Sequence, residues 1–152
     1  MSLRHLHTLV RFLLGAYLLF MGLSKAMDPV NFLKLLREYH LLASPFPLNV
    51  VAAWLPWVEV VCGLFLLVPV ALRGTALVVA GMFLFFSSVI LLRALELQSA
   101  QEISFCAVYF DCGCGVGVVN ACRKIGENTL WFLLALWLMC SSHSSRKLFP
   151  WR

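Results

Sequence analysis

The sequence predicts an all-α integral membrane protein, built as a four-helix bundle with an interfacial amphipathic helix and a cysteine-rich extracytoplasmic loop. Two observations carry this prediction. The chain has 152 residues, of which 62% are hydrophobic and only 12% are charged, and that charged share is about half of what soluble domains contain. The apolar residues also gather in long runs, and about 20 apolar residues cross a hydrocarbon core of roughly 30 Å. We expect one membrane domain over residues 1–152.

The charge balance indicates lipid rather than nucleic acid as the main surrounding. The formal net charge is +5, which fits basic residues that flank helices at anionic headgroups. The sequence has no clustered basic face interleaved with stacking aromatics, which nucleic-acid binding requires. We therefore expect contact with membrane lipid and no nucleic-acid partner.

The first predicted span covers residues 8–27. Arg11 and Lys25 lie near its two ends, where long basic side chains reach the headgroups. Gly15 and Gly22 are small enough to permit close packing against another helix. No small-x-small cleavage site follows the apolar run, so we interpret it as a retained helix rather than a signal peptide.

Asp28 and Pro29 form a helix-start signal, with Asp as N-cap and Pro at the first helical position. Residues 30–42 are too polar to span a membrane, but Phe32 and Tyr39 fall on one apolar face. This pattern is typical of an amphipathic helix in the membrane interface. A short helix packed on the mouth of the bundle is an equal alternative.

Three further spans are predicted at residues 48–72, 75–92 and 127–142. A tight turn at residues 73–74 makes the second and third spans antiparallel neighbours. Residues 94–101 continue the third span as a polar helical extension. The fourth span is short for a crossing helix, which tilt against its neighbours would accommodate.

One carboxylate, Glu59, lies well inside the second span, where a charge is costly and usually has a partner. Glu59 precedes Arg73 by 14 residues, and Lys25 follows Arg11 by 14 residues. At about 1.5 Å per residue, both groups lie roughly 21 Å from the same boundary. We predict a structural ion pair between Lys25 and Glu59 that fixes helix register. A proton route or quinone contact is the functional alternative, and a protonated, unpaired Glu59 is a third.

The cysteine loop covers residues 102–123 and is the one polar, glycine-rich place where reactive side chains gather. Cys112 and Cys114 flank a single glycine, and we expect them to be exchanging redox thiols, with Cys106 as a resolving thiol. Cys122 is the candidate partner for a second, structural disulfide. Four cysteines also bind zinc or iron–sulfur clusters, but this spacing matches no standard metal signature. We therefore expect no metal, with purely structural disulfides as the main alternative.

Neighbouring charges bear on thiol reactivity. Asp111 is a poor activator, because a carboxylate raises the pKa of a nearby thiol, whereas Arg123 or Lys124 would favour the thiolate. Cys62 and Cys140 lie within predicted spans, and we expect both to be inert core residues.

Charge does not decide the orientation of the bundle. Four spans place both termini on one side, and each side carries six basic residues. The terminal side holds Arg4, Arg11, Arg73, Arg146, Lys147 and Arg152, and the loop side holds Lys25, Lys34, Arg37, Arg93, Arg123 and Lys124. Closely spaced cysteines form disulfides in oxidising compartments. We therefore expect the loop outside and the termini in the cytoplasm.

The order of several short motifs resembles the MauE/DoxX-like family of small four-helix membrane proteins associated with redox chemistry. These motifs are G-L-S-K at residues 22–25, Asp28-Pro29 with Phe32, E-x-x-x-G at residues 59–63, C-G-C at residues 112–114, and Asn128 at the start of the last span. The resemblance covers most of the chain.

The resemblance implies a multi-pass protein of the bacterial inner membrane that delivers or processes disulfides in periplasmic redox proteins, as proposed for maturation of methylamine dehydrogenase. It makes a thiol–disulfide oxidoreductase the first functional hypothesis. The related DoxX and DoxD proteins are linked to quinone-coupled sulfur oxidation, so a quinone is a candidate cofactor and a quinone-coupled reductase subunit is one alternative. A non-catalytic accessory subunit of a larger membrane electron-transfer complex is another. The expected protein partner is a periplasmic redox protein or such a complex.

Overall fold

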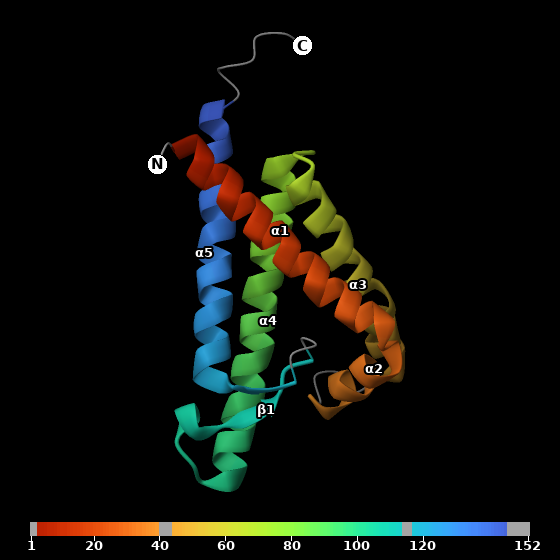
Figure 1. Ribbon diagram of the computed structural model, residues 1–152. Helices are drawn as coiled ribbons and strands as arrows, with labels where there is room; N and C mark the ends of the chain where they lie inside the picture. Colours follow the sequence, from red (N-terminus) through yellow and green to blue (C-terminus); the bar gives the residue numbers. More distant parts are fainter. Residues whose placement is uncertain (1–2, 40–43, 114–116, 146–152) are drawn as a thin grey trace.

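The computed structural model describes residues 3–39, 44–113 and 117–145. Most of this length is helical, as the sequence predicts, but the described part also contains two short strands that the prediction lacks (Figure 1). In chain order the elements are α1 (Leu3–Met27), α2 (Pro29–Glu38), α3 (Pro45–Leu67), α4 (Leu72–Gln101), the 3-10 helix η1 (Phe105–Ala107), β1 (Tyr109–Asp111), β2 (Val118–Asn120) and α5 (Ala121–Ser145).

The four long helices form two antiparallel pairs, α1 with α3 and α4 with α5 (Figure 1). The pairs meet at the end of the bundle that carries the start of α1. One core cluster there takes residues from all four helices, including Leu14, Leu66, Val79 and Leu138. Toward the opposite end α3 and α4 diverge. The core therefore joins the pairs at one end and leaves space between them at the other.

Three glycines let α1 and α3 approach closely. A Cβ on Gly22 would lie 2.7 Å from the Pro56 carbonyl oxygen, and a Cβ on Gly15 would lie 3.0 Å from the Gly63 carbonyl oxygen. Gly63 is constrained in return, because its Cβ would lie 2.9 Å from the Gly15 carbonyl oxygen. Small residues allow membrane helices this close backbone contact. The predicted packing role of Gly15 and Gly22 is confirmed.

The turn between the second and third long helices lies earlier than predicted. Helix α3 ends at Leu67 and α4 begins at Leu72, so the predicted turn at residues 73–74 is wrong. Pro69 explains the difference, because proline lacks the N–H that a continuing helix needs and clashes with the preceding turn. Ala71, with a φ of 46°, then takes the left-handed conformation from which α4 starts.

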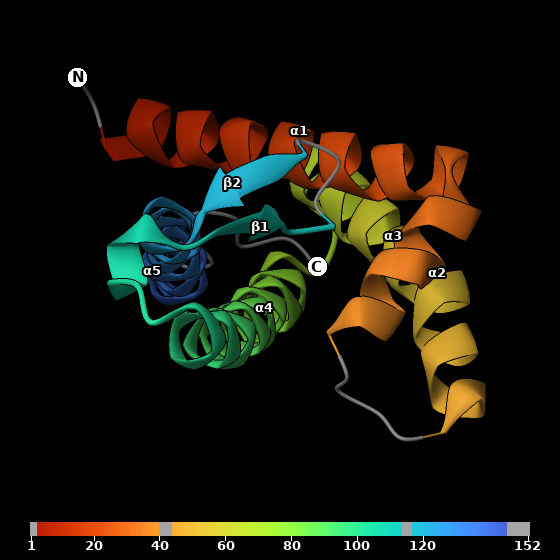
Figure 2. The same cartoon turned by 90° about the horizontal axis from the view of Figure 1, so that it is seen from below.

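Helix α2 begins as predicted. Asp28 is its N-cap, and the Asp28 carboxylate accepts a 3.1 Å hydrogen bond from the Asn31 N–H. Pro29 occupies the first helical position, where its missing N–H costs nothing. Phe32 is buried, whereas most polar side chains of α2 are exposed. Figures 1 and 2 show α2 beside the N-terminal part of α3, across the end of the bundle where the helix pairs diverge.

The cysteine loop folds into an antiparallel β-hairpin, with Phe110 of β1 paired to Val119 of β2. Val108 and Phe110 are buried against the second half of α4 near Ala94, whereas Tyr109 between them is exposed. This period of two is the mark of a strand, but three residues are too short a run to be recognised in a glycine-rich loop. Figure 2 shows the hairpin beside the C-terminal end of α4 and the N-terminal end of α5.

Three of the described helices are long and apolar enough to cross a membrane, at Leu3–Met27, Phe46–Leu67 and Leu72–Gln101. Their outer faces expose large apolar side chains, such as Phe12 and Leu84. The chain is therefore a multi-pass membrane protein whose helices contact lipid. Helix α5 runs beside α4 but carries several charged residues in its first turns. A fourth crossing by α5 stays a prediction.

Candidate redox site

A disulfide closes the base of the hairpin. Cys106 of η1 is bonded to Cys122 in the first turn of α5, with their Cα atoms 5.1 Å apart. The Asn120 side-chain nitrogen donates a 2.7 Å hydrogen bond to the Cys106 carbonyl oxygen. The Asn120 side-chain oxygen accepts a 3.1 Å hydrogen bond from the Arg123 N–H, which caps the start of α5. The bridge and Asn120 together fasten η1 to α5.

Cys112 lies at the opposite end of the hairpin, in the turn that follows β1. Its sulfur is disulfide-bonded, whereas Cys114 lies outside the described residues. The Asp111 carboxylate accepts a 2.9 Å hydrogen bond from the Gly113 N–H. Gly113 has a φ of 66°, a left-handed conformation in which any residue with a Cβ is strained. Asp111 and Gly113 therefore shape the turn that presents Cys112.

Tyr39, directly after α2, holds this turn from the helix side. The Tyr39 hydroxyl donates a 3.0 Å hydrogen bond to the Asp111 carbonyl oxygen. Its ring meets the Phe110 ring edge-on, with the two centroids 6.2 Å apart. Burial raises the pKa of the Tyr39 phenol above its usual value, and the nearby Asp111 adds to the shift. Tyr39 thus remains a protonated donor at neutral pH and ties α2 to the hairpin.

The structure brings Lys25 of α1 and Glu59 of α3 together. Lys25 Nζ donates a hydrogen bond to Glu59 Oε1, and the two residues are only 6% and 1% exposed. The ammonium also lies 5.7 Å from the ring centroid of Phe32 and 5.2 Å from that of Phe86, which adds cation–π attraction. Glu59 Oε2 is buried and has no hydrogen-bond partner among the described residues. The pair neutralises its two charges but leaves one acceptor unused.

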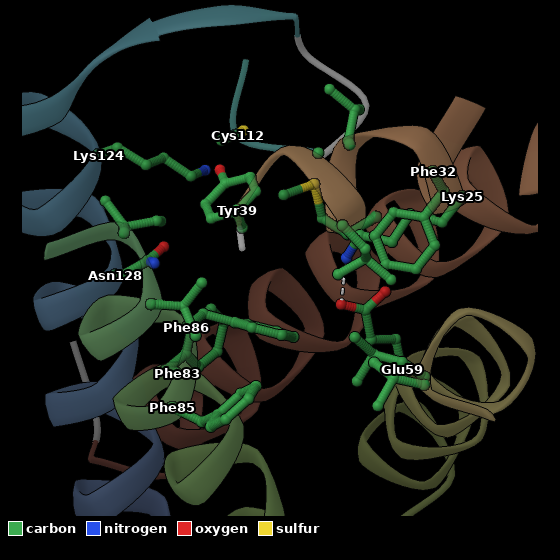
Figure 3. Close-up of a pocket in the computed structure, with 18 of the residues that line it drawn as sticks. Lys25, Phe32, Tyr39, Glu59, Phe83, Phe85, Phe86, Cys112, Lys124 and Asn128 are labelled. Carbon is green, nitrogen blue, oxygen red and sulfur yellow. Dashed lines mark hydrogen bonds and ion pairs between the residues drawn. The ribbon is translucent and has the colours of Figure 1, made fainter. Parts of the chain in front are cut away.

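A cavity of about 310 Å³ lies between the two helix pairs at the hairpin end of the bundle (Figure 3). Cys112 and Gly113 line it from the hairpin, and Lys25 and Glu59 line it from α1 and α3. The rest of the lining is mainly apolar and includes Val51, Leu55, Phe83, Phe85, Phe86 and Val89. Ligand pockets in proteins have volumes of roughly 300–1,000 Å³. The cavity therefore has the size of a small ligand site, with a disulfide sulfur at its edge.

Polar groups of α5 form the wall opposite the ion pair (Figure 3). Lys124 donates a 3.0 Å hydrogen bond to the Tyr17 hydroxyl and lies 3.6 Å from the Glu127 carboxylate. Asn128 is only 3% exposed, yet its amide has no hydrogen-bond partner in the described part of the chain. Figure 3 shows this amide directed into the cavity. Lys124 and Asn128 are four residues apart and so share one face of α5.

A smaller, more polar pocket of about 160 Å³ adjoins the cavity. Its own lining includes Ser24, Asp28, Asn31, Asp111 and Gly117. Four residues line both spaces, namely Lys25, Phe32, Leu35 and Gly113. These four residues form the partition between the apolar cavity and the polar pocket, directly beside Cys112.

A family model described as methylamine utilisation protein MauE matches residues 3–141. The chain belongs to the MauE family. The match includes the helix pairs, the hairpin and all six cysteines, and it confirms the family expected from the order of the sequence motifs. No curated protein and no solved structure shows significant similarity to this MauE-family chain.

The MauE-family chain separates residues that the sequence groups together. Cys106 is joined to Cys122, while Cys112 sits at the far end of the hairpin. The two cations that could stabilise a thiolate, Arg123 and Lys124, also lie in different surroundings. Arg123 is exposed and bonded to Glu127, whereas Lys124 is buried and lines the same cavity as Cys112. Lys124 is thus the cation that shares a space with the turn cysteine.

Two further cysteines, Cys62 and Cys140, lie outside the hairpin, in α3 and α5. Cys62 is a free, buried thiol as expected. Cys140 is also free, but it is exposed on α5, so the expectation that it is a core residue is wrong; an apolar run alone does not tell which face of a helix is buried. No group of three or more side chains that could hold a metal ion occurs within residues 3–39, 44–113 and 117–145.

The sequence reasoning missed Tyr17 and Asn120. Tyr17 is a hydroxyl-bearing residue in an apolar run, and its distance of 107 positions from Lys124 hides the contact. Asn120 carried a usable signal, because asparagine immediately before a helical pattern is a typical N-cap. The cavity itself had no signal, since it arises from the divergence of two helix pairs.

Proposed function

We propose that this MauE-family protein exchanges disulfides with a partner at the outer face of the bacterial inner membrane. Cys112 and Cys114 are the exchanging pair, and the Cys106–Cys122 bridge is structural. The observation that carries this proposal is the position of the disulfide-bonded Cys112. It lines the membrane cavity, and the adjacent Gly113 lines both that cavity and the polar pocket.

The reaction is an ordinary thiol–disulfide exchange. A thiolate of the partner attacks one sulfur of the Cys112–Cys114 disulfide, and a mixed disulfide forms while the other cysteine leaves as a thiolate. A second partner thiolate then attacks the mixed disulfide. The partner gains a disulfide and loses two electrons, and Cys112 and Cys114 each gain one electron and take up a proton. The same steps run in reverse when the partner is the stronger oxidant.

The two cysteine pairs differ in what surrounds them. The Cys106–Cys122 bridge spans 16 residues and joins two elements that Asn120 also joins, as a structural bridge does. Cys112 instead lies in the turn that Gly113 shapes, and a disulfide between Cys112 and Cys114, which are separated by one residue, would close a small, strained ring. Strained disulfides have more oxidising potentials and exchange readily. This contrast supports assigning exchange to Cys112 and Cys114.

We also infer the arrangement in the membrane. The start of α1 and the end of α5 lie at the end of the bundle away from the hairpin (Figure 1). With α5 as a fourth crossing, both termini are cytoplasmic and the hairpin is periplasmic, where disulfides persist. The partner is a periplasmic redox protein that acquires disulfides, and the family description points to methylamine utilisation.

The full chain in lipid nanodiscs tests this function against a reduced model peptide with two thiols. We expect the oxidised protein to oxidise the peptide, Cys112→Ser and Cys114→Ser to lose essentially all exchange, and the Cys106→Ser/Cys122→Ser double variant to retain it. Cys140→Ser is the matched control, because this thiol is free and lies on α5 away from the hairpin. Exchange that persists in Cys112→Ser and disappears with the Cys106–Cys122 bridge would contradict the assignment.

A second candidate is a non-catalytic subunit of a larger membrane complex. One observation favours it: Tyr109 and Val118 of the hairpin are 65% and 69% exposed, and a docked partner would cover them. In that case both disulfides are structural. The nanodisc experiment separates the two, because a structural subunit does not oxidise the peptide in any cysteine variant.

A further inference from the structure

The charged side chains are divided unevenly between the two ends of the bundle. All seven acidic side chains lie in the half that carries the hairpin, and they are Asp28, Glu38, Glu59, Glu96, Glu102, Asp111 and Glu127. The opposite end, which we call the terminal end, consists of residues 3–15, 64–80 and 135–145 (Figure 1). It contains three arginines and no acidic side chain, whereas the hairpin end has six basic and seven acidic side chains and is close to neutral. The terminal end is therefore a net cation.

Two of these arginines, Arg11 and Arg73, lack a counter-ion. The ion pairs within the described residues lie at the hairpin end and include neither of them. The Nε atom of each is buried and has no hydrogen-bond partner in residues 3–39, 44–113 and 117–145, and the same is true of Nε2 of His7, one turn before Arg11. A buried donor without an acceptor costs free energy, and hydrocarbon supplies none. These groups need an acceptor that the described chain does not provide.

Arg11 and Arg73 lie at the same level of the bundle. A Cβ on Gly15 would lie 3.0 Å from the Leu67 Cδ2 methyl, and Leu67 is the last residue of α3. Arg11 precedes Gly15 by one helical turn on the same face, and Arg73 follows Leu67 across the short turn into α4. Both arginines therefore lie near the α3–α4 turn, at the end of the spans, where long basic side chains reach the headgroups.

Both arginines also stand next to apolar side chains that face lipid. The Arg11 Cζ atom lies 5.3 Å from the ring centroid of Phe12, which is 48% exposed. Leu77 follows Arg73 by one turn on the same face of α4, and it is 58% exposed. A phospholipid has both matching parts, a phosphate for the guanidinium and acyl chains for the apolar surface. A free phosphate ion would leave the apolar neighbours uncovered.

We propose that the terminal end binds the phosphate groups of anionic phospholipids, with the guanidinium groups of Arg11 and Arg73 as donors. The planar guanidinium presents several N–H groups that match phosphate oxygens, and such charge-assisted hydrogen bonds are strong. Anionic lipids bind better than zwitterionic ones, because the terminal end has no carboxylate to pair with a lipid ammonium group. This site does not depend on the proposed exchange function.

Lipid binding is measured by titrating the detergent-solubilised full chain with phosphatidylglycerol or phosphatidylcholine and counting the bound lipids by native mass spectrometry. We expect the unmodified chain to bind phosphatidylglycerol more tightly than phosphatidylcholine. Arg11→Gln and Arg73→Gln should each weaken phosphatidylglycerol binding about tenfold, the loss of one charge-assisted hydrogen bond. The double variant should bind both lipids equally.

Arg93→Gln is the matched control. Arg93 is also an arginine of α4, but it lies at the hairpin end and pairs with Glu96 at 2.7 Å. Its loss should leave phosphatidylglycerol binding unchanged. Should a glutamine variant fail to fold, as judged by thermal unfolding, Arg11→Lys and Arg73→Lys take its place. They keep the charge but lose the planar fork, and we expect about threefold weaker binding.

Several outcomes overturn the inference. Equal binding of the two lipids by the unmodified chain does so, as does phosphatidylglycerol binding that the Arg11 and Arg73 variants leave unchanged. A loss in Arg93→Gln as large as that in Arg11→Gln would show attraction by overall charge instead of a site. Displacement of phosphatidylglycerol by an equal concentration of inorganic phosphate would assign the site to the free ion. Peptide oxidation is measured separately, so neither result decides the other.

Discussion

The two ends of the hairpin carry two disulfide-bonded sites that are built differently. At the base, Cys106 and Cys122 join η1 to α5, and Asn120 spans the same two elements with two hydrogen bonds. At the tip, Cys112 lies in a turn set by Asp111 and Gly113, against a cavity and near a polar pocket. The base connects elements of the fold, whereas the tip lies beside a cavity and a polar pocket.

This contrast agrees with the proposed division of roles, in which the base stabilises the fold and the tip exchanges disulfides. The bridge at the base joins η1 to α5, on either side of the two strands. We therefore expect the two strands to stay in register when the tip is reduced. Tyr39 adds a non-covalent anchor from α2 to the tip, so the turn keeps its place beside the cavity.

The support beneath the tip gives the largest expected effect on stability. Gly113 packs near Phe32, and the Lys25 ammonium lies over the Phe32 ring while it pairs with Glu59. Lys25→Met leaves a buried carboxylate without its cation, and Glu59→Leu leaves a buried ammonium, so each should lower the free energy of unfolding by about 3–5 kcal/mol. The Lys25→Met/Glu59→Leu double variant removes both charges and should lose far less.

Reversible unfolding in mixed detergent micelles measures all four members of this double-mutant cycle. Additive losses in the double variant would show that the two charges do not stabilise each other, and the tip would then lack this support. Thr129→Val, at an exposed position of α5, serves as an unaffected reference.

The base bridge should come next in size. Cys106→Ser with Cys122→Ser opens a loop with a sequence separation of 16, and bridges of this length contribute about 3 kcal/mol to the free energy of unfolding. The same double variant should still exchange disulfides through Cys112. Unfolding midpoints and peptide oxidation are measured on one preparation. A variant that keeps its stability but loses exchange would reverse the roles assigned to base and tip.

Asn120→Ala tests the base without touching a cysteine. It removes the hydrogen bond to the Cys106 carbonyl oxygen and the cap on the Arg123 N–H, for an expected loss of about 1–2 kcal/mol. Hydrogen exchange at the start of α5 should accelerate, while the potential of the Cys112 disulfide stays the same. A changed potential would mean that base and tip are coupled.

Tyr39→Phe tests the tip and should have the smallest effect, about 1 kcal/mol for one hydrogen bond. Its pH dependence follows from the raised pKa of Tyr39. The folded phenol holds its proton more tightly than the unfolded one, so the contribution is complete below the unfolded value of about 10 and is lost only above it. The stability difference between the unmodified chain and the Tyr39→Phe variant should thus be constant from about pH 6 to 9. A decline within this range would exclude the phenol as the donor.

The sequence predicted the features that depend on spacing along single helices. Asp28 and Pro29 marked the start of α2, and the glycines of α1 marked its contact with α3. Equal depth along two spans anticipated the contact between Lys25 and Glu59, because helical rise converts sequence distance into depth. Such features need no knowledge of how distant segments pack.

The features that depend on how distant segments pack could not be predicted from the sequence. The strands of the hairpin are three residues long, so their alternation is buried in a loop-like composition. Pro69 is a helix breaker that the sequence contains, but the turn was predicted at Arg73 and the following glycine instead. The cavity exists because α3 and α4 meet at one end and diverge at the other. The sequence alone does not show that Asn128 lines this cavity.

The most direct test of the central claim is the redox titration of the individual cysteines in native membranes. Mass-shift labelling across a glutathione potential series reports Cys106, Cys112, Cys114 and Cys122 separately. Cys112 and Cys114 should titrate together well above about −300 mV, the range in which structural disulfides resist reduction, while the Cys106–Cys122 bridge stays closed. A Cys112 disulfide that remains closed at every potential at which the base bridge is closed would contradict an exchange function.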